Sequence, residues 1–220
     1  MPDTHYLTTP VDRERIAGLA LGDSVYLSGD VVITAGIPSH QRLMEMLESD
    51  TPIPVPMAEG ALLHFGASHT QLDGKPDVAY INPTTSSRFN PFMPTIISRL
   101  GLRVVGGKGG LNAACAQAMR RTGCVYLSFP GGAAPLYARA LTAVRAVYWD
   151  DFIEHYRLTL LQVDALGPAT VAIDAEGRSL YDDIAHSAAA RLETIINELD
   201  RTRENDTAQC RGAAGNGSIT

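Results

Sequence analysis

Hydrophobic and polar residues alternate along the chain with a period that switches repeatedly between strand and helix. Residues 24–34 alternate β-branched and aromatic residues with small polar ones, which predicts a strand with a bend or bulge at Gly29. Pro38 suits the first turn of a helix, and apolar residues follow it at helical spacing. The proline-rich segment 51–56 must be extended, because proline fixes φ and disfavours helix in its predecessor.

The same reading of the remaining chain predicts an α/β protein. Further strands are expected over residues 5–10, 61–67, 78–81, 102–105, 124–129, 144–149, 158–163 and 170–173. Further helices are expected over residues 12–20, 92–100, 111–121 and 185–199. Strands and helices alternate in the middle of the chain, which is typical of an α/β fold. We expect one domain over residues 1–200 and a disordered tail over residues 201–220, where the chain becomes polar and glycine-rich.

Composition excludes several classes of function. With 45% hydrophobic and 19% charged residues the chain is an ordinary folded protein with a sizeable core. A net charge of −6 and the lack of clustered Lys and Arg argue against a nucleic-acid partner. The N-terminus lacks the basic and apolar regions of a signal peptide, and no apolar run approaches the ~18 residues of a membrane span. We therefore expect a cytoplasmic protein without a membrane partner.

Three cysteines, Cys115, Cys124 and Cys210, are too few and too widely spaced for a disulfide framework or a zinc site. We expect them to be reduced and structural, and we expect no metal site in this chain.

Two short segments carry candidate chemistry. Residues 82–88 place hydroxyl groups and the Arg88 guanidinium beside a proline-fixed turn, which suits bidentate binding of a carboxylate. Residues 106–110 place Lys108 among glycines, whose backbone N–H groups can approach an oxygen ligand closely. A helix cap and a strand-to-helix turn would use the same residues, so neither segment alone is decisive. Neither matches the Walker or the Rossmann glycine pattern, which argues against a nucleotide site.

The ordered combination of motifs is more specific than any one of them. The chain resembles the β subunit of iron–sulfur hydro-lyases, the class I fumarate hydratases and L(+)-tartrate dehydratases. The resemblance covers about residues 5–185, and it is carried by residues 22–29 (GDSVYLSG), 40–43 (HQRL), 83–88 (PTTSSR), 107–110 (GKGG) and 131–134 (GGAA). It implies a swivelling β/β/α three-layer domain. It also implies reversible hydration of a small carboxylic acid, with a [4Fe–4S] cluster held by an α subunit and an α2β2 heterotetramer.

The resemblance also implies roles for single residues. Thr84 corresponds to the family's proposed catalytic threonine, and Lys108 to a cationic contact beside it. Arg88 corresponds to a substrate-carboxylate clamp, with Thr85 and Gly109 as further substrate-binding residues. A threonine hydroxyl is a poor base, so Thr84 would need nearby positive charge or a proton relay.

Three further residues are candidates for a supporting role. His40 and His64 match family positions, but a structural role is the commoner one for a lone histidine. Arg42 is expected to support the loop of residues 82–88.

One stretch departs from the family pattern. Where the family carries an Arg–Asp pair before the matched histidine, this chain has Gly36 and Ile37. The resemblance implies that the family arginine binds the second carboxylate of the substrate. Because this chain lacks that arginine, we expect a substrate whose distal end is neutral, apolar or bulkier. Glycine at position 36 is expected to leave volume for such a group. Two alternatives remain at this point: a non-catalytic carboxylate-binding or regulatory paralogue of the same fold, and an anion-binding α/β protein that works without a partner.

Overall fold

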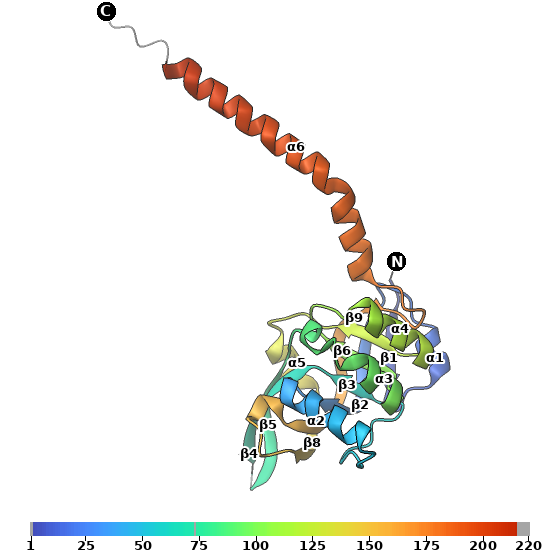
Figure 1. The fold of residues 1–220 in the computed structure, drawn as a ribbon. Helices are drawn as coiled ribbons and strands as arrows, with labels where there is room; N and C mark the ends of the chain where they lie inside the picture. Colours follow the sequence, from blue (N-terminus) through green and yellow to red (C-terminus); the bar gives the residue numbers. More distant parts are fainter. Residues whose placement is uncertain (1, 73, 215–220) are drawn as a thin grey trace, which may run out of the picture. The chain divides into compact units, whose positions relative to one another are not determined.

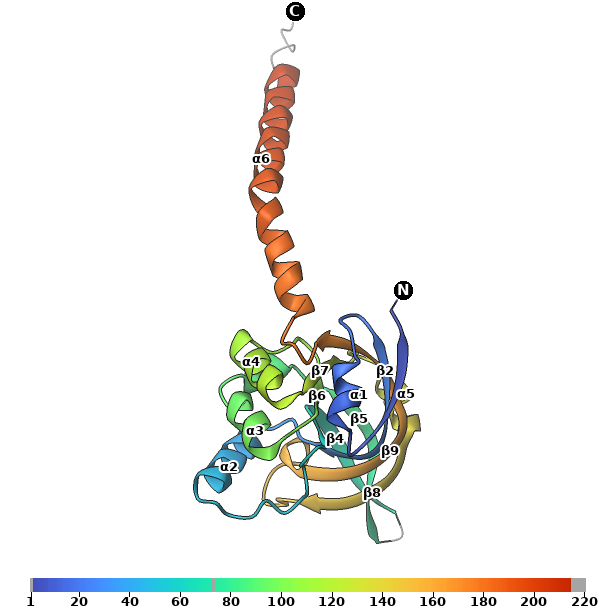
Figure 2. The ribbon, with the colours of Figure 1, turned by 90° about the vertical axis from the view of Figure 1, so that its right-hand side faces the viewer.

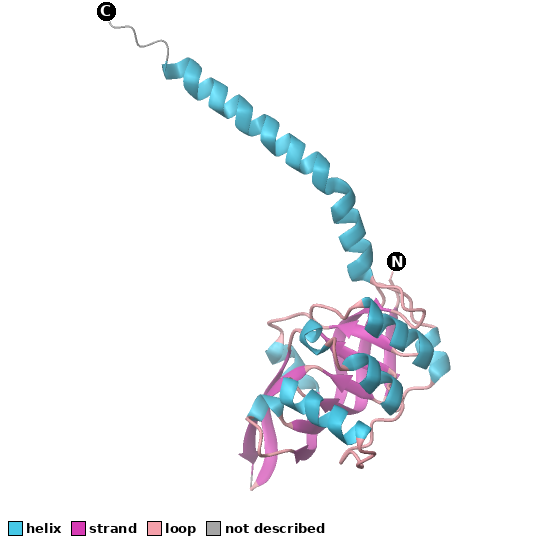
Figure 3. Cartoon of the chain, viewed as in Figure 1, coloured by secondary structure: helices cyan, strands magenta, loops and turns pink. Residues whose placement is uncertain are grey.

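A computed structural model describes residues 2–72 and 74–214 of the chain. The chain divides into two units, residues 1–180 and 181–220. The first unit is a mixed α/β domain, as the sequence predicts (Figures 1 and 3). Its strands are β1 (Thr4–Thr8), β2 (Ser24–Ile33), β3 (Ala61–Leu63), β4 (Phe65–Leu72), β5 (Lys75–Pro83), β6 (Val104–Gly107), β7 (Val125–Ser128), β8 (Leu141–Tyr148) and β9 (Leu158–Ile173). Its helices are α1 (Arg13–Ala17), α2 (Ile37–Glu48), α3 (Met93–Leu100), α4 (Ala113–Thr122) and α5 (Ala134–Ala140), with 3-10 turns η1 (Ser86–Phe89) and η2 (Glu154–Tyr156).

The main sheet closes on itself. Its strand order is β1-β2-β3-β6-β7-β9-β8, and β9 pairs with β2 as well as with β7 and β8. Strands β2, β3, β6 and β7 run parallel to one another, and β9 is antiparallel to β2 and β7, so these five strands form a ring. Strands β4 and β5 form a separate antiparallel hairpin. The bend or bulge expected at Gly29 corresponds to a register shift between β2 and β9 from Leu27 to Gly29.

Helices α2, α3 and α4 lie next to one another on one face of the sheet (Figures 1 and 2). α3 and α4 each end at a glycine in the left-handed region, Gly101 with φ 61° and Gly123 with φ 69°. Glycine adopts this conformation without steric cost, so it stops both helices and returns the chain to the next buried strand. The core is built from apolar side chains of the strands, such as Leu27, Leu63 and Val125, with exposed fractions of 0%.

Several boundaries differ from the expectation. The strands expected over residues 158–163 and 170–173 are one strand, β9, because its residues pair continuously with β2, β7 and β8. The strand expected over residues 61–67 divides at His64, where the main-chain N–H donates to Gly106 and the carbonyl accepts from Thr84. Long-range pairing therefore sets these limits, and local propensity does not.

The second unit contains helix α6 (Leu180–Ala214). The helix expected over residues 185–199 thus starts earlier and continues into the segment for which a disordered tail is expected. Residues 181–211 contain neither proline nor glycine and are rich in alanine and other helix formers, which explains the continuation. Residues 215–220 lie outside the described residues. In the described part of the chain, no helix is both long and apolar enough to cross a membrane.

Candidate functional site

The two loops with candidate chemistry lie side by side. The main chain of Lys108 donates to the carbonyl of Thr84 at 3.0 Å and accepts from the N–H of Ser86 at 2.8 Å. Thr85 and Lys108 form an isolated parallel bridge, and the N–H of Thr84 donates to the carbonyl of His64 at 2.7 Å. The end of β5 is thereby joined to the ends of β3 and β6. The backbone of both loops is fixed by sheet-like hydrogen bonds, which holds their side chains in a defined arrangement.

A pocket of about 360 Å³ opens at this junction. Thr84, Arg88 and Lys108 all line it, so the structure brings together the three residues on which the sequence interpretation depends most. The other lining residues are neutral or weakly basic: Ala35, Gly66, Tyr80, Asn82, Pro83, His155 and Tyr156. No described lining residue is acidic. Two cationic groups without an opposing carboxylate make the pocket suited to an anionic ligand.

Arg88 is held against Thr84. Its Nη2 donates to Thr84 Oγ1 at 2.5 Å, and its Nε donates to the carbonyl of Thr85 at 3.3 Å. The guanidinium carbon also lies 5.4 Å from the centroid of the Phe89 ring. A charge-assisted hydrogen bond to a hydroxyl oxygen stabilises negative charge on that oxygen. The contact therefore favours the form of Thr84 that could accept a proton.

Glycines surround Lys108 on both sides. Gly109 and Gly110 have φ angles of 77° and 75°, which a residue with a side chain rarely adopts. A Cβ atom at Gly131 would lie 3.6 Å from Lys108 Nζ, so the later glycine turn packs beside the ammonium group. Gly109 and Thr85 are adjacent to the pocket but are not among the described residues that line it.

His40 and His64 are buried next to each other, with 5.2 Å between their ring centroids. Both side chains are 0% exposed. His40 donates from Nδ1 to the carbonyl of Gly36 at 2.6 Å and stacks on Phe89 at 4.0 Å between ring centroids. His64 Nδ1 shares a hydrogen bond of 2.8 Å with Ser86 Oγ. Within the described chain, the Nε2 atoms of both histidines have no hydrogen-bond partner.

These surroundings keep both imidazoles neutral. Burial lowers the pKa of His40 to about 4, and the positive charge of Arg88 acts in the same direction, against the hydrogen bond to Gly36. Burial is the main cause that lowers the pKa of His64 well below its ordinary value, and the positive charge of Arg88 acts in the same direction. Neither imidazole lines the pocket, so the geometry supports a structural role behind the loop of residues 82–88.

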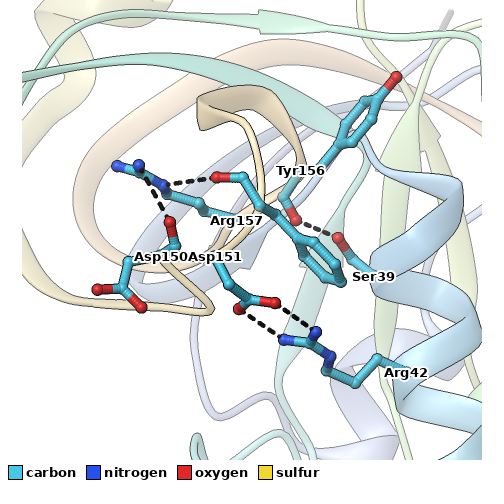
Figure 4. Close-up of polar contacts among 7 residues, drawn as sticks. Ser39, Arg42, Asp150, Asp151, Tyr156 and Arg157 are labelled. Carbon is cyan, nitrogen blue, oxygen red and sulfur yellow. Dashed lines mark hydrogen bonds and ion pairs between the residues drawn. The ribbon is translucent and has the colours of Figure 1, made fainter.

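Arg42 contacts a different segment from the one that the sequence suggests. It donates from Nη1 and Nη2 to the carboxylate of Asp151 at 2.9 and 2.6 Å, as Figure 4 shows. Its guanidinium carbon lies 3.9 Å from the centroid of the Phe152 ring. The carboxylate of Asp151 in turn raises the pKa of Arg42. Arg42 thus holds the connection between β8 and β9, and not the loop of residues 82–88.

The connection between β8 and β9 supplies two pocket residues that the sequence analysis missed, His155 and Tyr156. His155 donates from Nδ1 to the carbonyl of Ala67 at 2.8 Å, which leaves Nε2 as the acceptor nitrogen. The carbonyl of Tyr156 accepts hydrogen bonds from the hydroxyls of Ser39 and Thr34 (Figure 4 shows the contact with Ser39). In the sequence, His155 and Tyr156 are two neighbouring polar aromatic residues between two predicted strands. Nothing in the surrounding residues indicates that they line a pocket.

The expectation of free volume at Gly36 is wrong. A Cβ atom added there would lie 2.6 Å from Tyr156 Cβ and 2.7 Å from Ser39 Oγ. Tyr156 therefore packs directly against Gly36, and the glycine is needed for this close approach. Tyr156, which also lines the pocket, fills the space beside Gly36.

Thiols and carboxylates do not converge in the described part of the chain. Cys115 and Cys124 are both buried and free, and Cys210 lies among residues whose side chains are not described. Burial raises the pKa of the Cys115 thiol to about 11 and raises that of Cys124 further. Within residues 2–72 and 74–214, no group of three His, Cys, Asp or Glu side chains could hold a metal ion.

Comparison with known proteins gives consistent matches along almost the whole chain. Residues 4–184 match the protein family described as Fumarase C-terminus. The L(+)-tartrate dehydratase subunit beta of Escherichia coli (strain K12) is 29% identical over 193 residues, which cover 88% of this chain and 94% of that subunit. A putative L(+)-tartrate dehydratase subunit beta of Methanocaldococcus jannaschii is 30% identical over 192 residues, 87% of this chain and 98% of that protein. A putative fumarate hydratase class I of Geobacillus stearothermophilus is 33% identical over 84% of this chain but only 35% of its own length.

Proposed function

The chain belongs to the Fumarase C-terminus family, and from this premise we propose that it is the β subunit of a hydro-lyase. The reaction is reversible addition of water to, or removal of water from, a small hydroxy-carboxylic acid resembling malate or tartrate. The observation that carries this proposal is the convergence of Thr84, Arg88 and Lys108 on one pocket. The names of the relatives support the same reaction class.

Thr84 is the proton acceptor in this proposal. In the dehydration direction its oxygen takes a proton from the carbon next to the one that bears the departing hydroxyl. The electron pair of that C–H bond forms the double bond and the C–O bond breaks. In this proposal the hydroxyl leaves as water with a proton from the ammonium group of Lys108, which regains a proton from the Thr84 hydroxyl after the product departs. Arg88, 2.5 Å from Thr84 Oγ1, stabilises the deprotonated threonine, and the ammonium group of Lys108 faces the same pocket.

Arg88 and Lys108 also bind the substrate. Arg88 uses one Nη2 contact on Thr84 and retains further N–H donors for a carboxylate. Lys108 contributes a point charge whose position is set by the main-chain hydrogen bonds to Thr84 and Ser86. Thr85 and Gly109 maintain the backbone on either side of the pocket, which fits a positioning role better than direct contact.

The chain's own residues do not fit an iron–sulfur cluster. The described thiols are buried and have raised pKa values, and no described set of three ligands converges. We propose that a cluster-bearing α subunit holds a [4Fe–4S] cluster and that the two subunits form an α2β2 heterotetramer. The resemblance implies that this cluster supplies a Lewis acid for the substrate hydroxyl. A swivelling β/β/α domain, as in the family, would bring the pocket of Thr84 to that partner.

The distal end of the substrate is proposed to face His155 and Tyr156. Both line the pocket, and Tyr156 packs against Gly36, the position where the family carries an arginine. An imidazole and a phenol can donate or accept hydrogen bonds but provide no permanent charge. We therefore propose a substrate whose distal group is neutral and forms hydrogen bonds.

Activity of the reconstituted complex tests the reaction. The chain is coexpressed with a cluster-bearing α subunit and assayed anaerobically on fumarate, malate, L(+)-tartrate and the monoamides of the latter two. Thr84→Val keeps the shape of the side chain and removes the hydroxyl, so kcat should fall by about 100-fold or more. Thr142→Val, on the exposed edge strand β8, is the matched control and should leave kcat unchanged. A Thr84→Val complex with full kcat would refute the role of Thr84.

A non-catalytic carboxylate-binding paralogue remains the second candidate, because the family arginine is replaced by Gly36. It predicts ligand binding without turnover. Calorimetric binding of the same acids to the complex, together with no product under any condition, would favour this candidate over the hydro-lyase. A complex that neither binds nor converts any of these acids would reject both candidates.

A further inference from the structure

Helix α6 carries a row of exposed apolar side chains. The family match ends at residue 184, whereas α6 runs from Leu180 to Ala214, so most of this helix is additional to the family domain. Leu192 is 56% exposed, Ile195 43%, Ile196 47% and Leu199 52%. A single helix in water is only marginally stable, and large apolar residues on one stripe are typical of a surface that binds a partner.

The stripe has the spacing of a helix-pairing seam. Leu192, Ile195 and Leu199 follow one another at three and four residues, and Ala185 and Ala188 continue the same spacing toward the N-terminus. The opposite face of the helix carries small or polar residues: Ser187, Ala190, Thr194 and Asn197. Ile196 lies beside Leu192 and Leu199 and widens the apolar face on one side.

Charged residues beside the seam suit a second copy of the same helix. In a parallel pair, Glu198 of one copy lies opposite Arg203 of the other. In an antiparallel pair centred on the seam, Arg191 lies opposite Glu198. At Arg191, Glu198 and Arg203, both directions of pairing bring opposite charges together. The helix surface is therefore complementary to a second copy of itself.

We infer that α6 pairs with α6 of a second copy of this chain. The helix then serves as a dimerisation element that joins two chains independently of the α subunit. This inference does not depend on the reaction that the pocket performs. A helix that instead binds only the cluster-bearing subunit would have an unpaired seam in the isolated chain, and the isolated chain would be monomeric.

Sedimentation of the isolated full-length chain over a concentration series tests the inference. We expect a reversible monomer–dimer equilibrium in the absence of any α subunit. The triple variant Leu192→Asn, Ile195→Asn and Leu199→Asn should sediment as a monomer. The matched control Ser187→Asn, Ala190→Asn and Thr194→Asn places the same side chain three times on the opposite face, and it should dimerise like the wild type. A monomeric wild type, or a seam variant that dimerises like the wild type, would overturn the inference.

A charge variant tests the same surface without altering its apolar residues. Arg191→Glu combined with Arg203→Glu places Glu opposite Glu198 in either direction of pairing. The dimer dissociation constant should rise by roughly tenfold at low ionic strength, because attractive pairs become repulsive. High salt should reverse most of this change, since it screens exposed charges. A dissociation constant that does not respond to the charge reversal would contradict pairing through this seam.

Discussion

Arg88 donates a hydrogen bond from Nη2 to Oγ1 of Thr84 over 2.5 Å. This contact joins a permanent positive charge to a hydroxyl group at the wall of the pocket. Arg88 is also fixed by its bond to the carbonyl of Thr85 and by the neighbouring Phe89 ring. The orientation of the guanidinium is therefore set before any ligand binds, which reduces the entropic cost of binding a carboxylate.

Replacing Arg88 by lysine should impair turnover although the charge is retained. An ammonium group cannot hold Thr84 and form two parallel hydrogen bonds to a carboxylate at the same time. The loss of one charge-assisted hydrogen bond corresponds to ~1.5–3 kcal/mol, so kcat/KM of the complex should fall by about 10- to 100-fold.

Steady-state kinetics of the reconstituted complex checks the Arg88→Lys result. Arg99→Lys is a suitable control, because Arg99 pairs with the exposed Asp50 at the surface and not with a pocket residue. An Arg88→Lys complex that retains the kcat/KM of the wild type would contradict the clamp.

The buried histidines should make the protein sensitive to acid. The pKa of His40 is lowered to about 4 and that of His64 is lowered well below its ordinary value, so both bind protons less readily when folded than when unfolded. The unfolded chain takes up these protons first as pH falls below about 6.5. The free energy of unfolding should therefore decrease from about pH 6.5 toward pH 4, by up to ~3 kcal/mol for His40.

Urea unfolding at several pH values measures this dependence. His40→Phe removes the titrating group and retains an aromatic ring that can stack on Phe89, so the slope should decrease by about one proton. If His40→Phe leaves the slope at its wild-type value, His40 is not the group that titrates.

The ion pair of Arg42 with Asp151 should affect substrate affinity more than stability. Both side chains are exposed to solvent, at 30% and 57%, and exposed ion pairs of this kind contribute little to stability. The pair nevertheless anchors the segment that carries His155 and Tyr156. Arg42→Met should therefore raise KM by roughly threefold and change Tm by only a few degrees.

A double-mutant cycle with Asp151→Asn shows whether the effect comes from the pair. The double variant should bind substrate about as weakly as either single variant, because each change breaks the same contact. Arg99→Met is the matched control, since it removes a surface ion pair with Asp50. Additive effects on KM would show that Arg42 and Asp151 act separately.

Much of the pocket could be predicted from the sequence. Residues 82–88 and 106–110 each follow a strand, and the structure joins them through hydrogen bonds between the main chains of Thr84, Ser86 and Lys108. Strand β5 belongs to the separate hairpin with β4, so the two segments meet through the Thr85–Lys108 bridge and not as the ends of neighbouring parallel strands. The residue types in each segment were predictable from the local pattern, whereas this contact was not. The left-handed glycines beside Lys108 also fit the expectation of a close backbone turn.

The opposite wall of the pocket could not be predicted in this way. His155 and Tyr156 reach it because Arg42 pairs with Asp151 across 109 positions and Ser39 bonds to Tyr156 across 117 positions. No periodicity or turn signal near residue 155 carries information about these partners. The extent of β9 is similar, since a strand with Pro168 in its interior is continuous only through its pairing with β2 and β7.

The pairing of Gly36 with Tyr156 leads to the last prediction. A Cβ atom at position 36 would lie 2.6 Å from Tyr156 Cβ, so Gly36→Arg alone should displace η2 and destabilise the fold by about 1–3 kcal/mol. Tyr156→Ala would retain the clashing Cβ, whereas Tyr156→Gly removes it, and Ser39 Oγ can rotate away. Gly36→Arg combined with Tyr156→Gly should therefore fold and place a guanidinium at the distal end of the pocket. Its kcat/KM for L(+)-tartrate relative to the monoamide should rise by about tenfold or more over Tyr156→Gly alone, because one charge-assisted pair contributes ~1.5–3 kcal/mol. A wild-type complex that already prefers tartrate to its monoamide would show that another cation binds the distal carboxylate.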